Sequence, residues 1–181
     1  MAKLVSKTYG DALFAVAMEE KRVDEFFEAA KVVVEVLETN EDFGRLMNHP
    51  KIVKEDKISI VEETFGTRIP KEMTGLMTLM VTKGRESEMT SVFAYFVDLV
   101  KEEKKIGKAH VTTAIPLSQT QKEKVKNRLL DTTDYEVFEM YYHVDESLIG
   151  GMVIRIGDRV VDSSIKTKLQ DLSRSLRNIQ V

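Results

Sequence analysis

The sequence predicts an α+β protein: residues 1–105 form an all-α bundle of six helices, and residues 106–181 form a small mixed domain with a short sheet and two helices. Two observations support this prediction. Apolar residues recur at three- and four-residue steps through the first hundred residues, which is the spacing of helices. Runs of β-branched and aromatic residues follow the charged stretch at 101–108, where we place the domain boundary.

The first part of the chain contains clear helix boundaries. Asn40 is a suitable N-cap for a short helix, and Pro50 ends that helix because the residue before a proline disfavours helical dihedral angles. Pro70 suits a first helical turn, where its missing N–H costs nothing. With these signals the six expected helices cover 6–20, 23–38, a short segment after Asn40, 54–65, 70–83 and 86–104.

The second part alternates strands with helices. Ser118 and Gln121 have the spacing of a capping box, which predicts a helix at 118–130. Gly157 and Asp158 lie between two apolar runs and predict a hairpin with a type II′ turn. The expected strands are 109–115, 135–144, 152–156 and 159–161. A last helix begins near Asp162 or Ser163, and its apolar stripe consists of Ile165, Leu169, Leu172, Leu176 and Ile179.

The composition excludes several classes of protein. A hydrophobic content of 43% is enough for a buried core, so the chain is not disordered. The absence of cysteine excludes disulfides, thiolate catalysis and cysteine-ligated metal centres. A net charge of −3 gives no overall attraction to nucleic acid or anionic lipid. We expect neither a signal peptide nor a membrane span, because the apolar stretches are far shorter than about 20 residues.

The residues that carry chemistry form no catalytic pattern. His49, His110 and His143 are far apart and lack the spacing of metal ligands. Gly150-Gly151 could form a phosphate-binding nest, although a tight turn is the simpler interpretation, and the nucleotide-binding glycine motifs are absent. Asp162-Ser163-Ser164 could mimic a nucleophile motif, but an N-cap explains it more simply. We therefore expect no catalytic residue, no metal and no cofactor.

Two helices carry more apolar surface than one core-facing stripe requires. Met73, Met77 and Met80 share one face of the expected helix at 70–83. Methionine stripes usually fill cores, but they also line grooves that receive another helix. The first helix is also apolar on two faces. We hypothesise a groove for a partner helix, formed by Val5, Tyr9, Ala12 and Val16 opposite Met73, Leu76, Met77 and Met80.

One long segment resembles a known family. The run from Asp145 to Ile165, with its double glycine, apolar hairpin and Asp-Ser-Ser-Ile helix start, is similar to the C-terminal signature of the delta subunits of F-type ATP synthase. The mitochondrial equivalent is the oligomycin-sensitivity-conferring protein. Tyr9-Gly-Asp-Ala-Leu-Phe14 also resembles the first-helix motif of that family, although alanine is common there where Gly10 stands here. The resemblance covers essentially the whole chain.

The resemblance implies a non-catalytic stator subunit in proton- or sodium-driven ATP synthesis. In such subunits the helical domain binds N-terminal helices of the alpha subunits of the catalytic head, and the C-terminal domain binds the b subunits of the peripheral stalk. It implies a cytoplasmic protein attached peripherally to the inner face of the membrane through the complex, without nucleic acid or a membrane span of its own. The signature residues Gly150, Gly151, Asp162 and Ser163 are expected to be mainly structural.

Two other functions have weaker support in the sequence. An enzyme with a site built from scattered residues would need a pocket of converging titratable groups, which the sequence does not suggest. A nucleic-acid-binding or other helix-docking adaptor could use the last helix. Residues 162–181 carry four basic side chains against two acidic ones, a net charge of only +2. The basic residues are Lys166, Lys168, Arg174 and Arg177.

Overall fold

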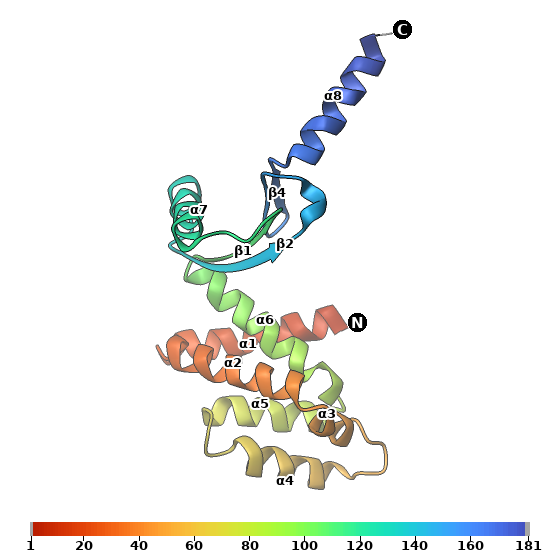
Figure 1. The fold of residues 1–181 in the computed structure, drawn as a ribbon. Coiled ribbons are helices and arrows are strands. Elements are labelled where there is room, and N and C mark those ends of the chain that lie inside the picture. Colours follow the sequence, from red (N-terminus) through yellow and green to blue (C-terminus); the bar gives the residue numbers. More distant parts are fainter. Residues whose placement is uncertain (1, 180–181) are drawn as a thin grey trace. The chain divides into compact units, whose positions relative to one another are not determined.

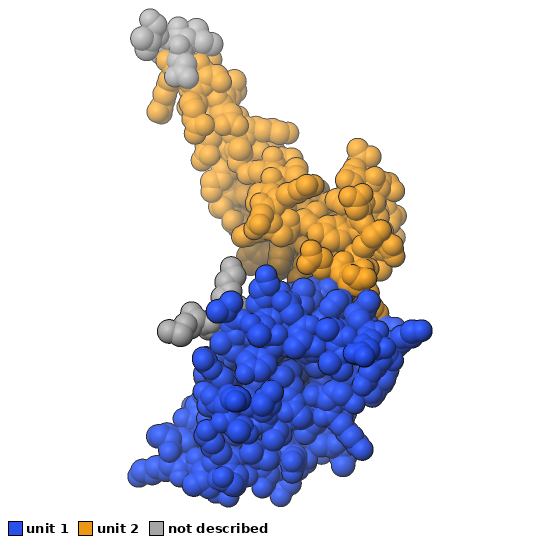
Figure 2. All heavy atoms as spheres, turned by 180° about the vertical axis from the view of Figure 1, so that it is seen from behind, with its two compact units in different colours: residues 1–101 blue, residues 102–181 orange. Residues whose placement is uncertain are grey.

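A computed structural model describes residues 2–179, and it confirms the expected α+β class. In this described part, six α-helices precede a four-stranded sheet that has two further α-helices (Figure 1). The chain divides into two compact units, residues 1–101 and residues 102–181 (Figure 2). The division falls within α6, a few residues before the boundary placed from the sequence. Each unit has a hydrophobic core of its own.

Unit 1 contains the expected bundle, with one difference at each end. The first helix begins at Ala2 rather than near residue 6, because neither proline nor glycine interrupts the preceding residues. A 3-10 turn, η1 (Glu86–Glu88), precedes the last helix, where one continuous helix was expected. The helices are α1 (Ala2–Glu19), α2 (Val23–Thr39), α3 (Glu41–Met47), α4 (Lys54–Phe65), α5 (Lys71–Thr82) and α6 (Met89–Glu103).

The core of unit 1 is built around α5, which contacts both α1 and α4. Large side chains from several helices are fully buried there, among them Phe26 of α2, Met77 of α5 and Phe93 of α6. Asn40 caps α3 as expected, since its side-chain Oδ1 accepts a 3.0 Å hydrogen bond from the Phe43 N–H. The regular helical spacing of apolar residues therefore does produce one continuous core.

Unit 2 is a four-stranded sheet in the order β2-β1-β3-β4. The strands are β1 (Ile106–Thr113), β2 (Val137–Val144), β3 (Met152–Ile156) and β4 (Arg159–Asp162). β1 and β2 are parallel and are connected by α7 (Gln119–Thr132), whereas β1–β3 and β3–β4 are antiparallel. Leu129 of α7 packs with Ala109 and Phe138 to form the small core of this unit.

Local signals in unit 2 agree with the structure, with one shift. Ser118 and Gln121 form the expected capping box, and Gly157 has the positive φ of 55° that a type II′ turn requires at its first position. β1 covers 106–113 rather than 109–115. Its first residues join the sheet because Gly107, which lacks a side chain, leaves room for the Phe138 ring: a Cβ on Gly107 would lie 2.5 Å from it.

Candidate partner-binding surfaces

The structure brings together the two helices that were expected to form a groove. α1 and α5 are in contact within unit 1. On α1, Val5, Tyr9 and Val16 are half-buried and Ala12 is exposed. Tyr9 and Val16 pack against the edge of the core, as Leu76 does on α5. Each of the two helices therefore keeps some apolar surface accessible.

The three methionines of α5 occupy a different place from the one predicted. Met73, Met77 and Met80 are fully buried in the core, so they lie beneath the surface and do not line an open groove. On α5 the accessible apolar side chains are instead Leu76 and the more exposed Leu79. A methionine stripe has the same helical spacing whether it faces a core or a partner, so the sequence could not distinguish the two. A direct partner contact remains a prediction for Leu76.

Exposed Leu4 and Met18 on α1 extend the apolar surface beyond the predicted residues. Sequence reasoning did not assign them to the groove, although the apolar residues all round α1 were a signal. Both lie on a different face of α1 from Tyr9 and Ala12, as the helical repeat requires, so they form a second exposed apolar face of this helix.

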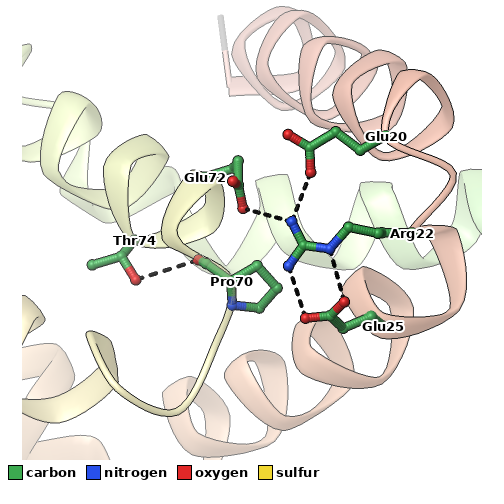
Figure 3. A network of polar contacts seen from close by, with 6 residues as sticks. All are labelled: Glu20, Arg22, Glu25, Pro70, Glu72 and Thr74. Atoms are coloured by element: carbon green, nitrogen blue, oxygen red, sulfur yellow. Dashed lines mark hydrogen bonds and ion pairs between the residues drawn. The ribbon is translucent and has the colours of Figure 1, made fainter.

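A network of charges around Arg22 joins the turn between α1 and α2 to the helices α2 and α5 (Figure 3). Arg22 donates hydrogen bonds of 2.7 Å to Glu20 and 2.8 Å to Glu25, and its Nη1 lies 3.6 Å from Glu72 at the start of α5. The hydrogen bond from Arg22 lowers the pKa of the Glu25 carboxyl, which therefore stays ionised. An ionised carboxylate held by arginine is suited to fixing helices and unsuited to donating a proton.

An open cleft of about 900 Å³ lies beside this network, between α2 and the loop that precedes α5. Its lining mixes acidic, basic and apolar side chains, without a concentration of one charge. Within residues 2–179, no cluster of three or more His, Cys, Asp or Glu side chains could hold a metal ion. The lining residues include Arg22, Glu25, Val32, Arg68, Ile69, Lys71 and Glu72.

The four signature residues of unit 2 meet at one junction, where the loop before β3 packs against the segment that leads out of β4. The Ile165 N–H donates to the Gly150 carbonyl at 3.0 Å. Gly151 has a φ of 75°, and a Cβ there would lie 2.4 Å from the Ser163 carbonyl oxygen. The Ser163 hydroxyl donates to the Met152 carbonyl at 2.9 Å. Gly151 is needed for this close approach, whereas a Cβ on Gly150 would meet only the end of the Ile165 side chain, at 2.7 Å. A tight turn therefore explains Gly150-Gly151 without a phosphate nest.

Asp162 completes the junction by starting the last helix, α8 (Ile165–Ile179). Its carboxylate accepts hydrogen bonds from the Ser164 N–H at 2.8 Å and from the Thr167 hydroxyl at 2.7 Å. The bond from the Ser164 backbone is the largest influence on the carboxyl and lowers its pKa. Ser164 itself caps α8 by accepting from the Thr167 N–H at 3.2 Å. The Asp-Ser-Ser run is thus a helix start.

α8 exposes an apolar stripe. Figure 1 shows it extending from the sheet of unit 2, and Ile165, Leu169, Leu172 and Leu176 are 43%, 52%, 58% and 57% exposed. The expected fifth member, Ile179, has its side chain outside the described residues. Val144 of β2 and Val161 of β4 are exposed apolar residues of the same unit. Exposed apolar rows of this kind are typical of surfaces that bind a partner.

These features are typical of a protein that connects partners, because each of its two units exposes apolar surface. Comparisons with known proteins agree. The family model for "ATP synthase delta (OSCP) subunit" matches residues 5–176. The ATP synthase subunit delta of Lachnoclostridium phytofermentans is 49% identical over the whole of both chains. That of Brevibacillus brevis is 32% identical, covering 96% of this chain and 99% of its own.

A solved structure shares the fold. A chain of the Toxoplasma gondii mitochondrial ATP synthase hexamer superposes with a TM-score of 0.73 at 20% identity, covering 94% of this chain and 96% of that one. The chain belongs to the ATP synthase delta (OSCP) subunit family, whose members are components of the peripheral stalk of F-type ATP synthase. It is a structural subunit and not itself catalytic. None of the comparisons supports the nucleic-acid-binding alternative.

Proposed function

We propose that unit 1 binds the N-terminal helices of alpha subunits and that unit 2 binds the b subunits of the stalk. The observation that supports this division most is the placement of accessible apolar surface. Unit 1 has the strip along α1 and α5, and unit 2 has the stripe of α8. A connector that resists torque needs two separate attachments, and a single shared surface could not supply them.

Burial of apolar area supplies the binding free energy at about 25 cal/mol per Å², before the cost of association is deducted. In unit 1 the buried methionines of α5 pack in the core and fix the position of this helix. Leu76 and Leu79 therefore lie on a helix that is already ordered. A preformed surface loses little conformational entropy when a helix docks onto it. None of the helices within residues 2–179 is long and apolar enough to cross a membrane. Attachment to the inner face of the cell membrane is therefore proposed to pass through the partners.

Co-purification tests this function. The full chain, tagged and expressed in its own organism, is recovered from membranes under mild, low-detergent conditions, and the bound proteins are identified by mass spectrometry. We expect alpha, beta and b subunits in amounts comparable to the tagged chain. Recovery of the tagged chain without any of these subunits would contradict the proposal.

A further inference from the structure

The two edge strands of the unit 2 sheet differ in how well they are protected from pairing with another chain. β4 is only four residues long and has charged residues, Arg159 and Asp162, at its two ends, and both features hinder the addition of a strand. β2 is eight residues long, contains no proline, glycine or lysine, and pairs with β1 at every position without a bulge. Among the residues that the structure describes, no strand lies beside the outer edge of β2. This edge is therefore open to a further strand.

The side chains of β2 favour such an addition. Its last four residues, 141–144, are all exposed, and they include two tyrosines and a valine. Aromatic and β-branched side chains stabilise cross-strand pairs, and on a long exposed edge they promote pairing with another chain. α7 reaches this part of the strand through Lys122, whose ammonium lies 4.8 Å from the centre of the Tyr142 ring, but it leaves the ring partly exposed.

The charges of β2 restrict how a second copy could pair with it. Two β2 strands related by a two-fold axis perpendicular to the sheet run antiparallel, and residues opposite each other must point to the same face. A pairing centred on Glu139 would place two carboxylates opposite each other. A pairing centred on Tyr142 would place Glu139 opposite Asp145 of the second copy. A pairing centred on Met140 would place Glu139 opposite Tyr141 and leave its charge without an opposite charge.

The pairing centred on Tyr141 is complementary. It places Glu139 opposite His143 of the second copy, and the two-fold axis repeats this pair on the other side of the centre. An imidazole has an N–H to donate to a carboxylate in either of its protonation states. On the other face of the sheet Met140 lies opposite Tyr142 of the second copy, a favourable contact between sulfur and an aromatic ring.

We propose that two copies of the free chain pair antiparallel along β2, with Tyr141 of each copy at the two-fold axis. The pairing joins two four-stranded sheets into one continuous sheet. Each copy uses its open β2 edge and retains only the short β4 edge, so association stops at two copies. β2 and β4 form opposite edges of the sheet, and α8 follows β4. The pairing surface is therefore separate from the α8 stripe, and the proposal does not depend on the partners proposed above.

Sedimentation of the full chain over a concentration series tests the charge pairs. His143→Glu places carboxylates opposite each other on both sides of the axis, so the Kd of the dimer should rise at least about tenfold. Adding Glu139→Lys to this variant puts a lysine opposite each glutamate, and the Kd should return to within about threefold of wild type. His49→Glu makes the same change at an exposed histidine of unit 1 and should alter the Kd by less than about twofold. Lys108 of β1 lies opposite position 139, so circular dichroism checks that the double variant is folded.

A cysteine at the two-fold axis tests the register. The sequence contains no cysteine, so an introduced thiol has no competitor. Tyr141→Cys places two thiols opposite each other, where the Cβ atoms of a cross-strand pair are about 4.5–5.5 Å apart, close to the separation found in disulfides. Val160→Cys, at an exposed position of β4, is the matched control. Mild oxidation should give covalent dimers of Tyr141→Cys and mainly monomers of Val160→Cys.

Five other results would overturn the proposal. A monomer at every concentration, up to those used for NMR, would exclude the pairing. Equal effects of His143→Glu and His49→Glu, or no recovery in the double variant, would exclude the Glu139–His143 contact. Equally fast oxidation of the two cysteine variants would exclude the register. A dimer that Leu172→Asp dissociates and His143→Glu leaves intact would place α8 in the contact. Loss of alpha or b subunits from co-purified His143→Glu would identify another subunit as the occupant of this edge.

Discussion

The ring of Tyr95 in α6 lies directly over Gly10 in α1. A Cβ built on Gly10 would be 2.4 Å from Tyr95 Cδ1, and the Tyr95 hydroxyl donates a 3.1 Å hydrogen bond to Asp11 Oδ1. A mid-helix glycine costs about 0.5–1 kcal/mol relative to alanine. The close approach of the ring explains why this chain has glycine at a position where the resemblance to the family leads one to expect alanine.

Gly10→Ala should therefore destabilise unit 1 by about 1–2 kcal/mol, although alanine is the better helix former, because the displaced ring strains the packing. In a Tyr95→Ala background the same substitution should be neutral or stabilising. Urea unfolding of the four variants gives the coupling between the two positions. Stabilisation by Gly10→Ala with Tyr95 present would contradict the contact.

A second pair, Lys57 of α4 and Glu86 of η1, is joined across the bundle by a 2.6 Å hydrogen bond, and the side chains are only 7% and 16% exposed. Glu86→Ala should cost about 3 kcal/mol, because it leaves a buried ammonium without its partner. Lys57→Met with Glu86→Gln should restore most of this loss, since replacing both charges removes the desolvation cost. Equilibrium urea unfolding measures both variants, and equal losses for the single and double variants would exclude this explanation.

This pair also predicts a dependence on pH. Burial alone would raise the pKa of the Glu86 carboxyl, but the hydrogen bond from Lys57 and the nearby positive charges outweigh it and lower the pKa. A carboxyl with a lowered pKa stabilises the fold above its unfolded pKa, which is about 4.3, and this contribution is lost as the pH falls through the folded value. The difference in stability between wild type and Glu86→Gln should shrink from pH 6 to pH 3, and a constant difference would argue against the pair.

The helices were predictable because their apolar periodicity is local and continues over many residues. The caps at Asn40 and Ser118 and the hairpin at Gly157 were predictable for the same reason: each depends on residues next to it in sequence. The parallel pairing of β1 with β2 was beyond the reach of such local signals, because it joins segments about thirty residues apart and depends on the intervening helix.

The candidate surfaces were only partly predictable. The α8 stripe appears in the sequence and is exposed in the structure. In α5, by contrast, the methionines face the core. Which face of a helix is buried in a bundle depends on how the helix is rotated about its axis, and all of its neighbours together set that rotation. The burial of Lys57 was also beyond sequence reasoning, since its partner lies 29 residues further along the chain.

The glycine junction of unit 2 predicts a large difference between two glycines. Gly151→Ala should destabilise unit 2 by at least about 2 kcal/mol, because φ is 75° and the new Cβ would collide with the Ser163 carbonyl. Gly157→Asn is the matched control: its φ is also positive, but there is open space around it and asparagine tolerates this conformation. Thermal unfolding measures the stability of the two variants. If Gly151→Ala and Gly157→Asn lost similar stability, the close contact at the glycine junction would not be the cause of the loss.

Asp162 predicts acid-sensitive fraying at the start of α8. Its carboxyl pKa is lowered mainly by the hydrogen bond from the Ser164 N–H, so its stabilising effect is present above the unfolded pKa and disappears as the pH falls through the folded value. Amide exchange of Ser164, followed by NMR, should therefore accelerate between pH 5 and pH 3 beyond the intrinsic trend. Asp162→Ala should show the accelerated exchange already at neutral pH. If the Ser164 amide exchanged equally slowly in wild type and in Asp162→Ala, this role of Asp162 would be refuted.

The assignment of separate partners to the two units is tested most directly by two variants of the full chain in one co-purification experiment. Ala12→Glu with Leu79→Glu places charge on the exposed strip of α1 and α5, and Leu172→Asp places charge on the exposed apolar stripe of α8. The first variant should lose the alpha subunits and keep b, whereas the second should lose b and keep alpha. Loss of both partners by each folded variant, or of neither, would contradict the assignment.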